Sequence, residues 1–297
     1  MQPKKLLFII NPKSGNNDKS TLEKQISIVC DKNKKEYALF YTTGKNDKEK
    51  IQEKQAEYQA DTLVACGGDG TVNMVAQLLL NSQTQLGIIP LGSANGLAYE
   101  LDIEDDIEES LELLMNGNSF SMDVIQINDE IICLHLSDLG FNAQMIKDFE
   151  ESGERGMLSY AKSFFGSLME KKTTEFRIEF NGTEKTVKAE MIVIANASSY
   201  GTGAVINPGS RLNDGSFELV IFKPIPLKDL LSLTLESFLG DIKNSPYVEI
   251  LKVEKAVITS QEAELLQVDG ELKGENKEVR AKILKGALKV ISKNEKQ

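Results

Sequence analysis

The first third of the chain alternates short apolar runs with amphipathic segments. The runs are bounded by turn residues, which is typical of buried strands. The segments between them repeat apolar residues every three or four positions, as Leu22, Ile26 and Val29 do, which is the spacing of one helix face. The pattern therefore predicts strands over Leu6–Ile10, Tyr37–Tyr41, Thr62–Cys66 and Leu86–Ile89, and helices over Lys19–Cys30, Lys48–Tyr58 and Val72–Leu80.

Repeated strand–helix units of this size predict a mainly parallel sheet with helices on both faces. On such sheets, ligands bind at the loops that leave the carboxyl ends of the strands. We therefore expect a binding site formed by residues 11–17, 42–46, 67–71 and 91–96.

The pattern changes after about Asp123, where short β-like runs follow one another. Turn signals such as Asn181-Gly182 and Asp214-Gly215 separate them, which is typical of an antiparallel β domain. One helical stretch, Met157–Met169, interrupts the series. The predicted strands are Val124–Ile127, Ile131–Leu136, Glu175–Phe180, Met191–Ala195, Phe217–Phe222, Glu249–Val253, Ala256–Ile258 and Leu265–Val268.

The chain is thus predicted to be an α/β protein with two domains, an α/β domain over 1–124 and a mostly antiparallel β domain over 125–297. The last strand, about 286–297, could return to the first domain.

The charge balance narrows the class of function. With 34 Lys and Arg against 45 Asp and Glu, the net charge is −11. Nucleic-acid binding needs a basic footprint, so we predict no nucleic-acid partner. Anionic membranes also repel such a chain at long range, and lipid contact should use a local patch.

The cysteines and the hydropathy indicate a cytoplasmic protein. Cys30, Cys66 and Cys133 are odd in number and far apart, which fits a reducing compartment. No stretch of about 18 apolar residues could span a membrane. Any membrane contact should therefore be peripheral, at the inner face.

The strongest local motif is Gly67-Gly68-Asp69-Gly70-Thr71, between a predicted buried strand and a predicted helix. Glycines let the backbone approach a ligand closely, and the amide groups at the start of the helix favour an anion. We therefore favour a phosphate-binding loop over a purely structural turn.

Two further loops follow predicted strands, Asn11-Pro12-Lys13-Ser14-Gly15 and Pro90-Leu91-Gly92-Ser93-Ala94-Asn95-Gly96. Each alone is only a set of turn residues, but all three loops lie at the same edge of the predicted sheet. The chain has neither a GxxxxGK[ST] phosphate loop nor a GxGxxG fingerprint.

Together these motifs resemble the diacylglycerol-kinase-like lipid kinases, including the bacterial ones. The likeness runs through nearly the whole chain in order, and includes Asp123, Leu212-Asn213-Asp214-Gly215 and Val268-Asp269-Gly270-Glu271. It implies an NAD-kinase-like α/β nucleotide-binding domain followed by a β-sandwich lipid domain.

The resemblance further implies that ATP binds among the loops of the first domain. The implied nucleotide-binding residues are Asn11, Pro12, Lys13, Ser14, Gly15, Thr42, Gly67, Gly68, Asp69, Gly70, Thr71, Asn73, Ser93 and Asn95.

For catalysis, the resemblance implies that Asp269 is the base that deprotonates the lipid hydroxyl, with Glu271 close by. Asp69 and Asp123 would join a network of Mg²⁺ and water near the phosphates. A carboxylate placed to accept the proton suits phosphoryl transfer. From the residues alone, however, a structural hairpin turn at Asp269-Gly270 is favoured over a catalytic role.

A second Mg²⁺ site, structural in the family, is implied at Asp214. The carboxylate of Asp214 and the backbone carbonyls of Arg211 and Ser216 would supply oxygen ligands, which magnesium prefers.

The resemblance favours transfer of the γ-phosphate of ATP to diacylglycerol or a related glycerolipid, with a sphingoid-type lipid as an alternative acceptor. Ser93 stands where the diacylglycerol kinases have threonine, and Gly92–Ala98 is also similar to the loop of sphingosine and ceramide kinases. NAD kinase, which shares the Gly67–Thr71 loop, is an alternative, and a non-catalytic nucleotide or lipid sensor is another. His135 is taken as structural.

The substrate should be met at a membrane surface. Residues 155–172 combine apolar side chains with lysines and an arginine, which suits contact with lipid, although the same apolar face could pack on the β domain. The oligomeric state is not fixed by the sequence, and a homodimer stays open.

Overall fold

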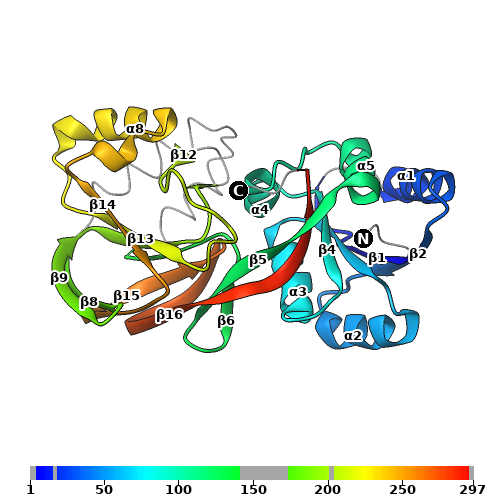
Figure 1. Cartoon of the computed structure of the whole chain (residues 1–297), viewed down its shortest axis with the longest axis horizontal. Coiled ribbons are helices and arrows are strands. Elements are labelled where there is room, and N and C mark those ends of the chain that lie inside the picture. The colour runs from blue at the N-terminus through cyan, green and yellow to red at the C-terminus, as the bar shows by residue number, and fades with distance from the viewer. Residues whose placement is uncertain (1–4, 16–18, 141–172, 201–203, 294–297) are drawn as a thin grey trace. The chain divides into compact units, whose positions relative to one another are not determined.

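The computed structural model describes residues 5–15, 19–140, 173–200 and 204–293. These form two compact units, Met1–Met122 with Gly286–Gln297, and Asp123–Lys285. The chain crosses from one unit to the other within two long strands, β5 (Asn118–Ile127) and β16 (Glu271–Ser292) (Figure 1).

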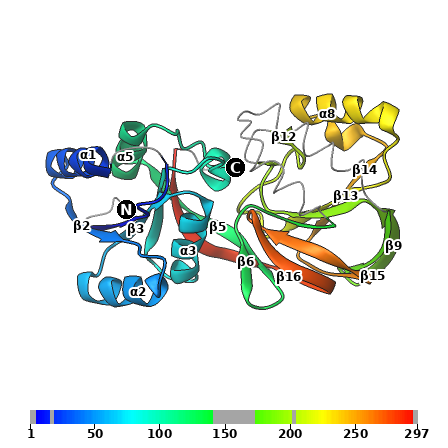
Figure 2. The ribbon, with the colours of Figure 1, turned by 180° about the vertical axis from the view of Figure 1, so that it is seen from behind.

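The first unit is built on a parallel sheet in the order β2, β1, β3, β4, and the end of β16 adds in parallel to β4 through Val290 and Leu86. Helices α1 and α5 lie on one face of this sheet, and α2 and α3 lie on the other (Figures 1 and 2). The bounds are β1 Lys5–Ile10, α1 Lys19–Lys32, β2 Glu36–Tyr41, α2 Asp47–Tyr58, β3 Thr62–Gly67, α3 Asp69–Leu79, β4 Gln85–Pro90, α4 Gly96–Glu100 and α5 Ile107–Asn116.

The two helical layers explain the continuous apolar runs of these strands. Successive side chains of a strand point to opposite faces, and here both faces are covered. Every residue of β3 is accordingly buried, and Phe8 of β1 packs with Leu22 and Ile26 of α1 in one core cluster.

The second unit is mostly antiparallel. Its strands pair in the order β14, β13, β10, β7, β15, and β15 also pairs with β8 and β16. The remaining bounds are β6 Ile131–Cys133, β7 Leu136–Leu139, β8 Thr174–Phe180, β9 Thr183–Ala189, β10 Met191–Ala195, β11 Ser199–Tyr200, β12 Ala204–Val205, β13 Phe217–Phe222, α8 Leu230–Leu239, β14 Val248–Val253 and β15 Lys255–Val268, with 3₁₀ turns at Leu227–Asp229 and Ile242–Asn244.

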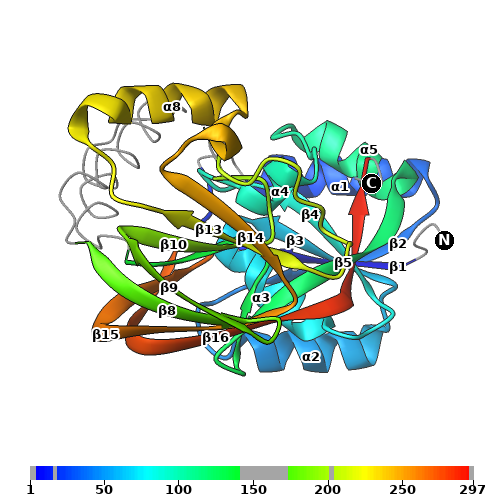
Figure 3. The ribbon, with the colours of Figure 1, turned by 60° about the vertical axis from the view of Figure 1, so that its left-hand side comes forward.

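Two core clusters lie on opposite faces of β10 and β13. On β10, Ile192 and Ile194 pack in the sandwich core with β8, β15 and β16, whereas Met191 and Val193 pack in a second cluster with Leu233 of α8. Figure 3 shows α8 over this second face. Both faces of the strand are therefore apolar.

The predicted α/β class with a second β-sandwich domain is confirmed. Among the described α-helices, α4, α5 and α8 lie outside the predicted elements, and the runs Ala256–Ile258 and Leu265–Val268 belong to one strand, β15. The predicted helix Met157–Met169 lies outside the described residues. Within the described part of the chain, no helix combines the length and apolarity that crossing a membrane requires.

Candidate active site

The predicted loops of the first unit leave the carboxyl ends of neighbouring parallel strands. Backbone hydrogen bonds join each loop to the next strand or loop. The amide of Asn11 donates to the carbonyl of Cys66 (3.0 Å), that of Thr42 to Ile10 (2.9 Å), and that of Leu91 to Gly67 (2.9 Å). The loops after β1, β2, β3 and β4 therefore form one continuous edge.

Three of these loops carry the predicted motifs: the first loop is Asn11–Gly15, the second is Gly67–Thr71 and the third is Pro90–Gly96. The second and third loops touch through glycine. A Cβ added to Gly92 would lie 2.6 Å from the Cα of Gly68, and one added to Gly68 would lie 3.2 Å from the Cα of Gly92. Any side chain at either position would push the two backbones apart. The close approach brings the start of α3, which has no side-chain cap, next to the third loop.

The first loop is joined to the second by a side chain. Nδ2 of Asn11 donates to Oγ1 of Thr71 (3.3 Å), and Oδ1 of Asn11 accepts from the amide of Lys13 (3.0 Å). Pro12 and Lys13 are exposed, so the loop presents its backbone and a lysine ammonium to solvent. Gly15 has a φ of 67°, and a Cβ there would meet the carbonyl oxygen of Leu91 at 2.7 Å.

Asp69 connects α3 to the third loop. Its carboxylate accepts hydrogen bonds from the backbone amides of Asn95, Gly96 and Leu97, where α4 begins. Burial raises the pKa of this carboxyl, and the amide donors act against that rise. The structure thus gives Asp69 a positioning contact, and its predicted part in a magnesium network stays a prediction.

The other predicted residues of this edge fall into buried and exposed groups. Asn95 is buried, accepts from the amide of Gly92 (2.9 Å) and donates to Asp105 (3.0 Å). Asn73, in the first turns of α3, accepts from Gln77 (2.6 Å). Ser93 is exposed at the tip of the third loop.

In the second unit, Asp269 lies in the hairpin turn between β15 and β16, with a φ of 47°. Its carboxylate accepts from three consecutive backbone amides, Leu134 (2.9 Å), His135 (3.0 Å) and Leu136 (3.3 Å). The thiol of Cys133 also donates, at 3.4 Å. The predicted hairpin turn is confirmed, and backbone amides hold its carboxylate in place, whereas the role of Asp269 as a base stays a prediction.

Glu271 has a different environment. It begins β16, its side chain is 63% exposed, and it pairs with the ammonium of Lys273 at 2.7 Å. Glu271 follows the turn that contains Asp269, and its catalytic role stays a prediction.

A buried network links the segment that holds Asp269 to Asp123 and to the turn at Asp214. Nδ2 of Asn196 donates to the carbonyls of Leu134 and Asp123, each at 3.0 Å. The buried carboxylate of Asp123 accepts from the amide of Gly215 (2.6 Å). Asn196 therefore connects the segment that holds Asp269 to the turn that contains Asp214.

The turn at Asp214 was predicted to hold magnesium together with Arg211 and Ser216. Oδ1 of Asp214 accepts from the amide and the hydroxyl of Ser216 (3.1 and 2.5 Å), and Oδ2 pairs with the ammonium of Lys252 at 2.5 Å. Despite partial burial, Lys252 and Ser216 hold the pKa of this carboxyl below its ordinary value. A carboxylate is a ligand type that suits magnesium, but here a lysine already neutralises it.

His135 and Asn196 were not predicted as site residues. Nδ1 of His135 faces the backbone carbonyl of Ser199, and the buried Nε2 has no hydrogen-bond partner within the described ranges. Burial lowers the pKa of this imidazole to about 4. No sequence motif marks Asn196, because its contacts are to backbone carbonyls, which every residue carries.

The first unit thus has a continuous edge of glycine-bearing loops, and the second has a carboxylate held by backbone amides at Asp269. Residues 5–127 match the diacylglycerol kinase catalytic domain, and residues 138–292 match the YegS C-terminal NAD kinase beta sandwich-like domain. This chain belongs to the family of lipid kinases with that pair of domains, and the resemblance seen in the sequence is confirmed.

Individual proteins with similar sequences are also named as lipid kinases. The chain is 26% identical to a protein named "Diacylglycerol kinase" from Bacillus subtilis (strain 168), over 91% of both chains. It is 30% identical to one named "Probable lipid kinase YegS-like" from Citrobacter koseri, over 77% of this chain and 78% of the relative.

Solved structures show the same fold. Two structures from Bacillus anthracis str. Sterne each cover 98% of this chain and 98% of their own. One has a TM-score of 0.83 at 21% identity, and another, described as a diacylglycerol kinase, has a TM-score of 0.76 at 20% identity.

Proposed function

We propose that this lipid kinase transfers the γ-phosphate of ATP to the hydroxyl of diacylglycerol or a related glycerolipid. The proposal is supported by membership of the family, by the name of the Bacillus subtilis relative, and by the anchored carboxylate of Asp269. The last observation carries it, since an otherwise ordinary hairpin turn has its carboxylate held by three amides.

In this proposal the first unit binds ATP. Where the two loops touch, Gly68 and Gly92 have no side chains, so phosphate oxygens can approach the backbone amide groups there. The uncapped start of α3 adds the favourable end of a helix dipole. Lys13, exposed in the first loop, would neutralise phosphate charge.

Asp269 would act on the lipid. Its carboxylate accepts the proton of the acceptor hydroxyl as that oxygen attacks the γ-phosphorus, and the bond from the γ-phosphorus to the β–γ bridging oxygen breaks to release ADP. The amides of Leu134, His135 and Leu136 fix the orientation of the carboxylate before the lipid arrives. Such a positioned base contributes roughly 10²–10⁴-fold to the rate.

Magnesium would neutralise the phosphate charge when it is bound with ATP. Asp69 and Asp123 are the proposed partners of its water shell, and both already orient backbone amides. Asp214, with the carbonyls of Arg211 and Ser216, is the proposed structural site, and Lys252 would have to withdraw from Asp214 for an ion to bind there.

We propose a cytoplasmic enzyme that meets its lipid at the inner face of the membrane. Residues 155–172, predicted to touch lipid, lie outside the described residues, so this contact stays a prediction.

A phosphorylation assay with a panel of acceptors tests the proposed function. The purified protein is incubated with γ-labelled ATP, magnesium and micelles of diacylglycerol, monoacylglycerol, phosphatidylglycerol, sphingosine or ceramide, with NAD as a soluble acceptor. We expect the fastest transfer to diacylglycerol. Label in NAD alone would favour an NAD kinase, label in sphingosine or ceramide a sphingoid kinase, and ATP binding without transfer a sensor.

A further inference from the structure

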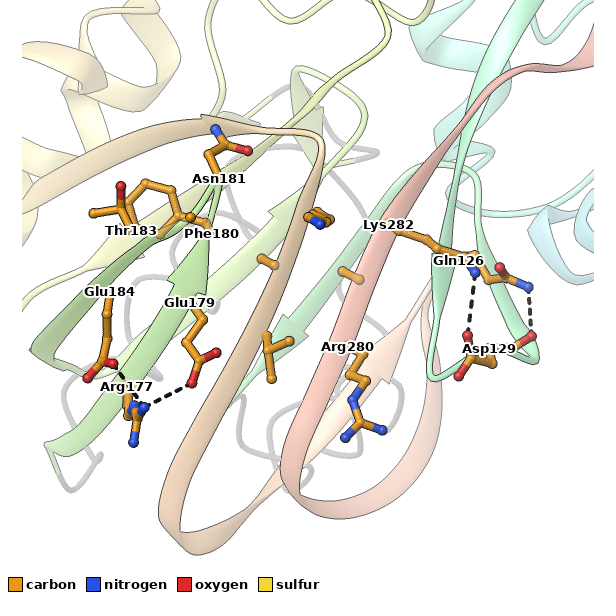
Figure 4. Close-up of a pocket in the computed structure, with 15 residues that line it drawn as sticks. Gln126, Asp129, Arg177, Glu179, Phe180, Asn181, Thr183, Glu184, Arg280 and Lys282 are labelled. Carbon is orange, nitrogen blue, oxygen red and sulfur yellow. Dashed lines mark hydrogen bonds and ion pairs between the residues drawn. The ribbon is translucent and has the colours of Figure 1, made fainter.

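The outer face of the β domain has a groove of about 550 Å³, lined in part by Lys255–Val257 of β15 and Arg280–Lys282 of β16, the paired segments on the far side of the hairpin from the turn at Asp269. Strands β8, β15 and β16 form its floor, and the β5–β6 and β8–β9 turns form its ends (Figure 4). Its volume is in the range of small-molecule sites. None of its lining residues was predicted from the sequence as a site residue.

The groove has two halves of different charge. On the β8–β9 side, Arg177 lies between Glu179 and Glu184, at 3.1 and 2.9 Å, so its charge is matched by carboxylates (Figure 4). On the β15–β16 side, three cations, Lys255, Arg280 and Lys282, line the groove with one acid, Asp129.

The partners on the cationic side are few. Lys282 pairs with Asp129 at 3.5 Å, and Arg280 pairs with Glu278, which does not line the groove. The ammonium of Lys255 has no ion-pair partner among the described residues. Both ion pairs are largely exposed, and exposed ion pairs contribute little free energy, so an incoming anion can compete for these cations.

The strand register places like charges side by side. Lys255 stands directly opposite Lys282, and Val257 stands opposite Arg280 and Glu179. Directly opposite like charges destabilise an antiparallel pair, and here the exposed carboxylate of Asp129 offsets the charge of Lys282 alone. Val257 and the partly buried Phe180 supply apolar surface beside the cations.

We propose that this groove binds the phosphate headgroup of an anionic phospholipid at the membrane surface. Lys255, Lys282 and Arg280 would contact the phosphate, and Val257 and Phe180 would contact the adjoining glycerol and acyl carbons. In a chain of net charge −11, such a local basic site is needed to hold an anionic surface. The binding rests on the groove alone and does not depend on the proposed reaction.

Vesicle sedimentation with the full-length protein tests this proposal. Vesicles of phosphatidylcholine alone are compared with vesicles that also contain phosphatidylglycerol, at low and physiological salt. We expect binding only to the anionic vesicles, and weaker binding at higher salt because the exposed charges are screened. The double variant Lys255→Glu/Lys282→Glu should bind at least about tenfold less tightly.

Lys188→Glu is the matched control, because Lys188 is an exposed lysine of the same unit that does not line the groove. It makes the same change of charge per site and should bind like the wild type. If the double variant unfolds early, Lys255→Gln/Lys282→Gln should show the same direction of loss.

Three results would overturn the proposal. They are binding of the wild type to neither kind of vesicle or to both equally, equal binding by the double variant and the control, and variant-sensitive binding of soluble glycerol 1-phosphate without any binding to vesicles. The last would assign the groove to a soluble phosphate ester.

Discussion

At the scale of single residues, the site is organised by side chains that hold backbone groups. Asp69, Asp123 and Asp269 each accept from backbone amides, and Asn196 donates to two carbonyls. Each of these contacts fixes a loop that carries a predicted functional group. Replacing such a side chain should therefore change the geometry of the loop as well as remove a charge.

His135 should make stability depend on pH. Burial lowers its pKa from 6.5 to about 4, so between these values the unfolded chain binds a proton that the folded chain excludes. Stability should be intact above about pH 6.5 and fall as the pH drops toward 4, by up to about 3 kcal/mol. Denaturant unfolding at several pH values measures this.

The control for this prediction is His135→Gln, which cannot gain a proton. Carboxyls whose pKa is lowered in the folded protein, such as Asp47 and Asp214, contribute stability that is lost mainly below their ordinary pKa, near 4. These carboxyls are present in both the wild type and the variant, so their effect cancels in the comparison. An equal slope for wild type and variant between pH 6.5 and 4.5 would mean that His135 is accessible to solvent protons.

Asp214→Ala should lower the melting temperature and remove any stabilisation by magnesium. In Lys252→Ala the ammonium that neutralises Asp214 is absent, so magnesium should stabilise that variant more than the wild type. Thermal unfolding with and without magnesium measures both. If magnesium stabilises the wild type and Asp214→Ala equally, the predicted metal site is wrong.

At the scale of elements, the loop edge depends on backbone contact between the second and third loops. Gly92→Ala would place a Cβ 2.6 Å from the Cα of Gly68, so the loops must separate. When a positioned group moves by about 1 Å, the activity of an enzyme can fall by up to about 10²-fold. We therefore expect separation of the two loops to weaken ATP binding by roughly 10- to 100-fold. Calorimetric titration with ATP measures this.

Gly182→Ala is the control for backbone strain. Its φ is 77°, and an added Cβ would meet nothing within 4 Å. It should cost about 1–2 kcal/mol of stability and leave ATP binding unchanged. Equal ATP affinity in Gly92→Ala and the wild type would mean that the two loops do not bind phosphate together.

Asn196→Ala tests the network behind Asp269. It leaves the carbonyls of Leu134 and Asp123 without this donor, which should cost about 2–4 kcal/mol and lower turnover. Asn207 is also buried, and donates to Ala197 and Glu218 instead. Asn207→Ala should therefore destabilise similarly but retain turnover, and equal turnover in the two variants would exclude a role for the network.

Much of the fold could be predicted because its elements have strong periodicity. The parallel strands are continuous apolar runs, and Asn181-Gly182 does connect two paired strands, β8 and β9. α8 was not predicted in this way, because Leu231, Leu233 and Leu235 in its sequence LLSLTLESFL alternate with polar residues, which is the pattern of a strand. The prediction divided β15 into two strands because polar residues after Thr259 interrupt its apolar pattern. In the structure, the pairing of β15 with β16 shifts register at this point.

The site residues that could be predicted stand in sequence motifs. The contacts that could not be predicted are made by backbone groups. Gly68, Asp69 and Asp269 stand in recognisable motifs, whereas the donors to Asp269 are amides of residues 134–136, which carry no signature. α5 did offer a signal, since Asp106 caps it through the amides of Glu108 and Glu109. The groove lined by Lys255 and Lys282 needs the pairing of distant strands, which only the structure provides.

At the scale of the whole molecule, the two units divide the predicted chemistry. The nucleotide loops belong to Met1–Met122, and Asp269 belongs to Asp123–Lys285. β5 and β16 each contribute residues to both units, so the units are joined by two continuous strands. A change in the second unit can therefore be used to separate chemistry from ATP binding.

Asp269→Asn tests the central claim most directly, when lipid phosphorylation and ATP affinity are measured on the same preparation. Glu278→Gln is the control, because Glu278 is an acid of the same strand β16 that pairs with Arg280 and was not predicted as a site residue, so turnover should change less than about tenfold. For Asp269→Asn we predict a turnover about 10²–10⁴-fold lower with ATP affinity nearly unchanged. Near-normal lipid phosphorylation by this variant would contradict the account.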